Sequence, residues 1–247
     1  MKAHERQRLK KDEVAETLQE VYQRVAQHRN RIVTAIAAAV ALVVVVGGWT
    51  WYRSHRDARA GAMLAEALVV AEAEVVTPTP PAEGQPPAPQ PPNTYPTEQA
   101  KLEAALPKFL AAADAYPSTS AGIVARYHAA TTLAALGRAD EARAQYQMVV
   151  DRDGRGLYGR MARLGIAQLD LQAGRHDEAI KVLHELSLDV KGDLPVDAVL
   201  VHLGEAYLAA GRKAEAQQAF QRVTTEFADS PYASDAQRQL DALKAGA

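Results

Sequence analysis

Histidine is the residue type of this sequence best suited to catalysis or metal binding, and the chain has seven. His176 and His184 lie eight residues apart, and His202 is remote from both. The sequence contains no HExxH motif, no paired-carboxylate or nucleophile-elbow arrangement, and no glycine loop that could cradle a phosphate. Cysteine is absent, which excludes disulfides, thiolate metal sites and a cysteine nucleophile. We therefore expect no enzyme, no cofactor, no metal site and no small-molecule substrate.

The composition favours closely packed helices. Apolar residues make up 48% of the chain but aromatic residues only 6%, and alanine is abundant. Small side chains let helices approach closely, whereas a β-sandwich would need more β-branched and aromatic residues. The formal net charge is −2, so the total charge does not indicate a nucleic-acid partner.

Glycine–arginine pairs mark an internal repeat of 37 residues. The pairs begin at Gly137, Gly174 and Gly211. A glutamate, an alanine, a large apolar residue and a small residue recur at the same spacing: Glu141, Glu178 and Glu215; Ala142, Ala179 and Ala216; Tyr146, Leu183 and Phe220; Ala130, Ala167 and Gly204. The repeat therefore has six matching columns.

The repeat columns predict a helical hairpin. The glycine ends the first helix in a left-handed conformation, and the small residue of that helix lets the second helix approach. The alanine and the large apolar residue of the second helix lie on one face and fill the core. One hairpin cannot bury its own apolar stripe, so neighbouring hairpins must stack. We expect an all-α fold.

This pattern resembles tetratricopeptide repeats, whose unit has about 34 residues. The consensus of the first helix is complete only in the last unit, at Leu200, Leu203, Gly204 and Tyr207. The earlier units carry arginine, Arg126 and Arg163, where a large apolar residue is usual. The resemblance implies an α-solenoid of tetratricopeptide-like hairpins over residues 98–247, ending in a polar capping helix from Pro231 to about Leu243.

One period upstream, Ala105 aligns with Ala142 and Phe109 with Tyr146. Residues 98–116 are therefore predicted as the second helix of an earlier unit, with a start or a kink at Pro107. Its first helix is expected in residues 53–76, a helical extension of the segment before it. The three additional residues of each period are expected in the connections, such as 151–156 and 190–194.

Residues 77–97 contain nine of the thirteen prolines of the chain. Proline removes backbone donors and fixes φ, so this segment is predicted as a Pro-rich, extended linker. It is interpreted as an inert spacer or long loop, and the alternative is a PxxP-type ligand for an aromatic groove.

Residues 32–52 form a run of 21 residues without a charge. At ~1.5 Å per residue a helix of this length spans about 31 Å, close to the thickness of the hydrocarbon layer. We expect a single transmembrane helix, with Trp49, Trp51 and Tyr52 at the interface. The alternatives are a buried core helix and a signal peptide cleaved after Ala58-Arg59-Ala60, although the apolar run is longer than a usual signal h-region.

The N-terminal tail, residues 1–31, holds eight Lys and Arg against five Asp and Glu. The positive-inside rule places such a tail in the cytoplasm and residues 53–247 outside it, which is the periplasm in a diderm bacterium. Val14, Leu18, Val21 and Val25 form an apolar stripe on a charged helix. This helix could lie on the membrane surface, pair with a cytoplasmic partner or self-associate.

Repeat stacks present the first helices of their hairpins as a concave groove. By repeat position, the predicted partner groove consists of Tyr127, Thr131, Met161, Leu164, Gln168, Leu171, Val201, Glu205 and Leu208. It lacks the Lys and Asn clamps with which chaperone-binding members of the family hold a peptide carboxylate. It is moderately apolar, which suits extended or partly unfolded polypeptide, and about half of its residues are expected to pack between repeats.

The order of tail, span and alanine-rich repeats resembles the YfgM-like ancillary subunits of the SecYEG translocon. The resemblance implies a protein of the bacterial inner membrane that binds translocon subunits, periplasmic chaperones or exported polypeptides. The proline segment departs from what we expect of that family. Two alternatives stay open: an envelope scaffold for division or outer-membrane assembly factors, and a regulator whose N-terminal tail sequesters a cytoplasmic protein.

Overall fold

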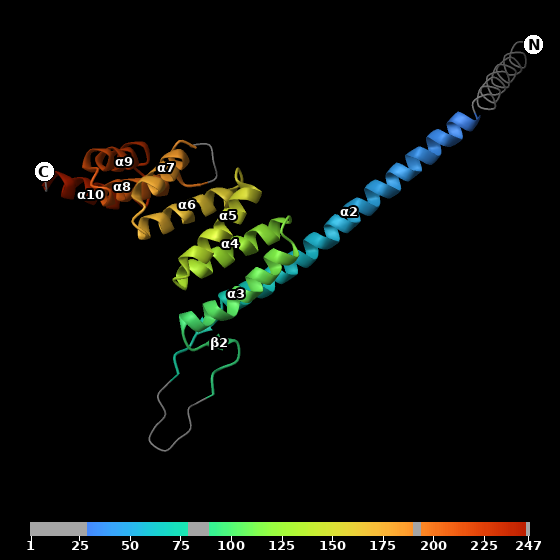
Figure 1. The fold of residues 1–247 in the computed structure, drawn as a ribbon, viewed down its shortest axis with the longest axis horizontal. Helices are drawn as coiled ribbons and strands as arrows, with labels where there is room; N and C mark the ends of the chain where they lie inside the picture. Colours follow the sequence, from blue (N-terminus) through green and yellow to red (C-terminus); the bar gives the residue numbers. More distant parts are fainter. Residues whose placement is uncertain (1–28, 79–88, 190–193, 246–247) are drawn as a thin grey trace, which may run out of the picture. The chain divides into compact units, whose positions relative to one another are not determined.

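The structure is a computed structural model that describes residues 29–78, 89–189 and 194–245 (Figure 1). The stripe of the N-terminal tail, the middle of the proline segment and most of the predicted connection 190–194 lie outside the described residues. The described elements are α2 (Arg29–Ala71), β1 (Glu74–Val75), β2 (Thr94–Tyr95), α3 (Glu98–Ala115), α4 (Ser120–Ala135), α5 (Ala139–Asp153), α6 (Leu157–Gln172), α7 (His176–Ser187), α8 (Val196–Ala209), α9 (Lys213–Glu226) and α10 (Ala233–Ala245). They belong to two compact units, Met1–His55 and Arg56–Ala247.

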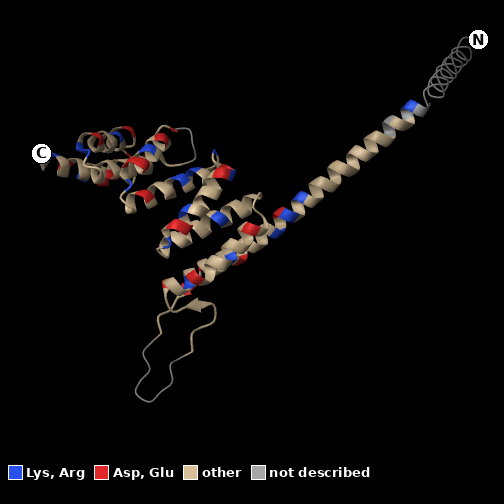
Figure 2. Ribbon diagram, in the orientation of Figure 1, with Lys and Arg blue, Asp and Glu red and all other residues tan. Residues whose placement is uncertain are grey.

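The first unit contains the apolar half of α2. Its described side chains from Ala37 to Tyr52 are all exposed, and those of Val43 and Trp51 retain 70% and 71% of their accessible surface. In Figure 2 this stretch of α2 is a long tan section without blue or red. Among the described residues, one helical segment, Ala37–Ala71, is long and apolar enough to cross a membrane, with a mean hydropathy of 1.2.

The second unit is an all-α solenoid of helical hairpins, as the repeat predicts. From α3 to α10 each helix packs against the next one in the chain. The first helices of successive hairpins also touch, α4 against α6 and α6 against α8. This stacking buries the apolar stripe that a single hairpin would leave in water.

The three repeat glycines end their helices in the predicted conformation. Gly137, Gly174 and Gly211 have φ values of 75°, 75° and 74°. After each glycine, the N–H of the following arginine donates to a carbonyl five residues earlier, for example Arg175 to Asp170 at 2.8 Å. The glycine N–H donates to a carbonyl three residues earlier. This pattern is a Schellman cap, which satisfies the last carbonyls of a helix and requires a left-handed residue.

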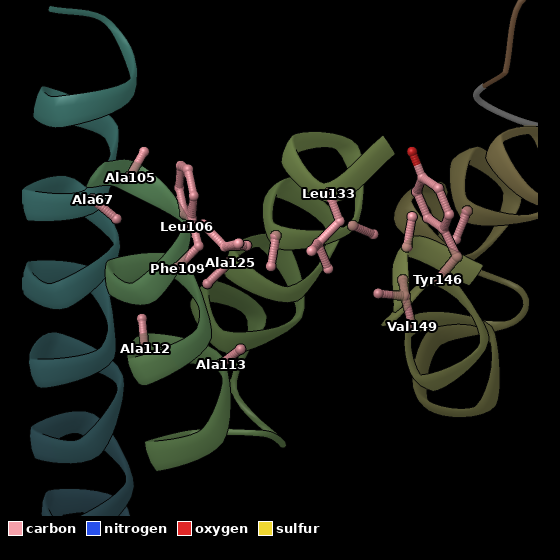
Figure 3. Close-up of a cluster of buried hydrophobic side chains, with 14 of the residues drawn as sticks. Ala67, Ala105, Leu106, Phe109, Ala112, Ala113, Ala125, Leu133, Tyr146 and Val149 are labelled. Carbon is pink, nitrogen blue, oxygen red and sulfur yellow. The ribbon is translucent and has the colours of Figure 1, made fainter. Parts of the chain in front are cut away.

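The apolar core forms two clusters that meet at α6. The first, drawn in Figure 3, joins the end of α2 to α3, α4 and α5 and includes Phe109, Leu133 and Tyr146. The second joins α7 to α10 and is centred on fully buried side chains such as Leu200 and Phe220. Helix α6 contributes Ile166 and Leu169 to the first cluster and Ala167 to the second.

The junction between α2 and α3 differs from the sequence prediction. Helix α2 ends at Ala71 rather than at 76, because β1 pairs in parallel with β2. Gln90 Nε2 donates to the Val76 carbonyl at 3.0 Å and to Thr94 Oγ1 at 2.9 Å. We call residues 74–76 and 90–95 the stem. The stem holds the two ends of the proline segment together.

Helix α3 begins at Glu98, where Thr97 Oγ1 caps it by accepting from the N–H of Ala100 at 3.1 Å. The helix therefore starts nine residues before Pro107, which lies inside it. The structure thus has a helix over the predicted residues, and of the two alternatives given for Pro107, a start and a kink, the start is wrong. The N-cap and the burial of Leu106 and Phe109 on either side of the proline outweigh the loss of one backbone donor.

Candidate partner-binding face

The predicted groove residues lie on the first helices of three successive hairpins. Tyr127 and Thr131 belong to α4, Met161 to Leu171 to α6, and Val201 to Leu208 to α8. None of them is fully buried, seven are half-buried, and Gln168 and Glu205 are exposed. We call this set the A-helix face: Tyr127, Thr131, Met161, Leu164, Gln168, Leu171, Val201, Glu205 and Leu208.

Two side-chain contacts connect neighbouring helices across this face. The rings of Tyr127 on α4 and Tyr158 on α6 have centroids 5.5 Å apart and meet edge to face. Between α6 and α8, Gln168 Nε2 lies 3.4 Å from His202 Nε2. The three helices therefore present one continuous surface.

Five apolar members of the A-helix face are anchored in the core from one side. Tyr127 packs against the first core cluster and its ring also contacts that of Tyr146 at 5.8 Å. Leu164, Leu171 and Val201 pack against the second cluster, as does Leu208. Side chains that are fixed on one side and open on the other lose little conformational entropy when a partner covers them.

Two histidines of this surface were missed by the sequence analysis. His128 and His202 lie 74 residues apart, which is twice the repeat period, so they occupy the same repeat position. Gly165 stands at that position in the unit between them. Their spacing gives no metal-ligand signal, but the 37-residue period places both on the first helices of their hairpins.

Burial shifts the pKa values of two aromatic side chains of α4. The His128 ring stacks on Phe109 at 5.2 Å between centroids. Burial lowers the pKa of His128 below its ordinary value of 6.5, and the carboxylate of Glu72 opposes this shift. Burial also raises the pKa of Tyr127, with a smaller contribution from Tyr158. Both side chains are therefore uncharged near pH 7.

A buried carboxylate, Asp170, connects three elements behind the face. Asp170 is 1% exposed and accepts hydrogen bonds at Oδ1 from Arg143 of α5 and from Arg175 Nε at 2.8 Å. Arg175 precedes α7. The other repeats place Leu133 and Tyr207 at this position. The sequence did not predict these ion pairs of Asp170, because a single aspartate in a helix forms no recognisable spacing pattern.

The arginines of the GR pairs have different partners in the three repeats. Arg138 binds Glu141 through two hydrogen bonds of 2.7 and 2.6 Å, and Arg212 binds Glu215 at 3.2 Å. Arg175 turns to Asp170 instead. A depression at the hairpin turns is lined by residues that include Arg175, His176, Asp177 and Arg212, and no residue of the A-helix face lines it. Within the described part of the chain, no three His, Asp or Glu residues are grouped as metal ligands.

Comparison with known proteins agrees with this architecture. The model of the family described as tetratricopeptide repeat-like domain matches residues 25–245. No curated protein matches the chain. Among solved structures, Pseudomonas aeruginosa pilF is similar over 76% of this chain and 69% of its own, with 16% identity and a TM-score of 0.54. A set of nearly identical TPR-like repeats from Podosopora anserina is similar over 58% and 77%, with 16% identity and a TM-score of 0.50. At these identities the similarity concerns the fold alone.

Proposed function

Because this chain belongs to the family of tetratricopeptide repeat-like domain proteins, we propose that it is a membrane-anchored protein-binding module that assists the export of newly made proteins. Repeats of this family form protein–protein interaction modules, and proteins built from them are typically non-enzymatic. The observation that carries the proposal is the A-helix face. It offers apolar side chains that are anchored beneath and accessible above, which suits a polypeptide partner.

The exposed apolar run of α2 supports the membrane anchor. Side chains such as Val43 and Trp51 would be in contact with water along the whole run if no membrane covered them. At the end of the run, the rings of Trp51 and His55 stack with centroids 5.6 Å apart. Such amphipathic rings favour the boundary between hydrocarbon and water. The proposed span is residues 32–52.

Two observations support the proposed orientation and partners. They are the basic residues before this span and the resemblance to YfgM-like translocon subunits. The N-terminus lies in the cytoplasm, and the solenoid lies in the periplasm of a bacterial inner membrane. The partners are translocon subunits, periplasmic chaperones or exported polypeptides.

The orientation can be tested by thiol labelling, because the chain has no cysteine of its own. Lys244→Cys places a thiol on an exposed side chain of α10, and Lys2→Cys places one at the other end. In intact cells a membrane-impermeant maleimide should label the first variant and not the second. Labelling of the Lys2→Cys variant alone would reverse the orientation, and labelling of neither would place the whole chain in the cytoplasm.

The partner class can be tested by crosslinking in cells. A photoreactive residue replaces Tyr127, Leu164 or Val201, and Lys181, an exposed residue of α7, serves as the control position. Translocon subunits, periplasmic chaperones or many exported chains are expected from the three face positions and not from the control. A single dominant division or assembly factor would favour an envelope scaffold and refute the export role. Equal products from Lys181 would mean that the A-helix face is not the binding surface.

A further inference from the structure

The charge of the A-helix face limits what it can bind. The two helices α4 and α6 contain three arginines, and α8 contains neither lysine nor arginine. Arg126 reaches Asp114 of α3 at 2.6 Å and Gln145 of α5 at 2.8 Å. The second helices of two successive hairpins, α3 and α5, thus hold the Arg126 side chain. Acidic and basic residues are otherwise interspersed along the repeat helices (Figure 2).

The two arginines of α6 are also directed away from the face. Arg160 Nη1 donates to the carbonyl of Arg155 at 2.9 Å and lies 3.3 Å from Asp189. Arg163 Nη2 donates to the carbonyl of Gly154 at 2.9 Å. These partners belong to connections at the end of the hairpin. Consequently, no cation of α4, α6 or α8 is available to hold a carboxylate on this face.

The face does carry a carboxylate, that of Glu205. Its side chain is 50% exposed, and Oε2 lies 3.1 Å from His202 Nδ1. His202 Nδ1 is the donor to this carboxylate oxygen, and on the other side of the ring Gln168 Nε2 lies 3.4 Å from His202 Nε2. These contacts hold the carboxylate of Glu205 in place on the face. Among the described residues, no lysine or arginine forms an ion pair with Glu205.

We propose that the A-helix face takes an apolar polypeptide segment that carries a lysine or arginine, whose cation meets Glu205. This inference rests on the proposed function, since it specifies the chemistry of the polypeptide that the face binds. The apolar contacts come from residues such as Leu164, Val201 and Leu208, and the cation complements a carboxylate with which no described lysine or arginine forms an ion pair. A segment with an acidic residue would instead place a like charge beside Glu205, and the arginines of α4 and α6 are engaged with other partners. Charge of this kind selects among partners more than it adds affinity.

The test compares two labelled peptides of leucine, alanine and serine that differ only in one central residue, lysine or glutamate. The full chain is held in phosphatidylcholine nanodiscs, and empty nanodiscs give the blank. Fluorescence anisotropy measures binding. An ion pair at an exposed site is worth ~0.2–1 kcal/mol, so we expect the lysine peptide to bind about 1.4- to five-fold more tightly.

Variants assign this preference to one residue. Glu205→Gln should remove the preference, and Glu205→Lys should invert it. Glu185→Lys makes the same change of net charge on an exposed residue of α7 and should leave the preference intact. The preference should also shrink at high salt, because exposed charges are screened.

The outcomes separate this inference from the proposed function. Equal affinities for the two peptides would refute the charge selectivity and leave polypeptide binding standing. Tighter binding of the glutamate peptide would point to an acidic partner and also refute the inference. If a second copy of the chain occupies the face, it competes with the peptide, and the apparent affinity for the peptide falls as the protein concentration rises. That result would refute the inference. If neither peptide binds, both the inference and the proposed binding surface are refuted.

Discussion

Gly204 of α8 lies against the Phe220 ring of α9, and adding one methyl group at this glycine tests how tightly the last hairpin is packed. A Cβ at Gly204 would lie 2.6 Å from Cε1 and Cζ of Phe220, which is fully buried. Carbon atoms are in optimal contact at about 3.5–4.0 Å, so the Phe220 ring must move. Overpacking of this kind costs about 1–3 kcal/mol, whereas replacing glycine by alanine in a helix contributes about 1 kcal/mol of stability. The expected net effect of Gly204→Ala is a loss of about 1 kcal/mol.

Thermal unfolding, followed by circular dichroism of the full chain in detergent, measures this loss. For a domain of this size, 1 kcal/mol corresponds to about 2–4 °C in Tm. The matched control is Gly61→Ala in α2, because no atom lies within 4 Å of the added Cβ. The control should raise Tm by a similar amount through helix propensity alone. An equal rise in both variants would refute the clash.

A second variant tests the pairing itself. The preceding repeat places Ala167 and Leu183 at the positions of Gly204 and Phe220. The double change Gly204→Ala with Phe220→Leu recreates that pair, so it should be more stable than the sum of the two single changes predicts. A coupling free energy of about 1 kcal/mol is expected for residues in direct contact. Simple additivity would contradict the reasoning.

Two further predictions concern groups that the solenoid buries. Asp170→Leu inserts the residue that the preceding repeat carries at Leu133, so it should change the free energy of unfolding by less than ~1 kcal/mol. Asp170→Ala leaves a void and should lower the free energy of unfolding by about 1–3 kcal/mol. Similar Tm values for the two variants would contradict this reasoning. Because burial lowers the pKa of His128 in the folded state, the unfolded chain binds more protons below pH 6.5, and stability should fall as the pH drops through this value. His128→Gln should reduce the difference in Tm between pH 7.5 and pH 5.5, and an unchanged difference would exclude His128 as the source.

The 37-residue period predicted the hairpins because each of its columns has one physical cause. A left-handed residue is needed at the end of a first helix, and Gly174 supplies it with a φ of 75°. The large residues Tyr146, Leu183 and Phe220 are all buried, as the spacing of a single helix face requires. Local patterns of this kind depend on a few neighbouring residues, so the sequence alone reveals them.

The features that were missed depend on contacts between distant residues. The stem pairs residues that are 20 positions apart, Glu74 with Thr94, and neither strand is long enough to show an alternating pattern. Asp170 is compatible with a buried helix position only because arginines of α5 and of the turn before α7 reach it. The place of Arg126 could not be predicted either, since the consensus has an apolar residue there and the partner Asp114 belongs to the previous hairpin.

The stem has a consequence for how the chain can be altered. It joins the two ends of the proline segment through backbone and Gln90 hydrogen bonds before α3 begins. The free energy needed to close a loop grows only with the logarithm of its length, by about 0.6 kcal/mol for each doubling. The segment between Val76 and Gln90 can therefore gain or lose residues at small cost to the repeats. It is a favourable position for an epitope tag or an inserted domain, and a position where insertions and deletions can accumulate during evolution.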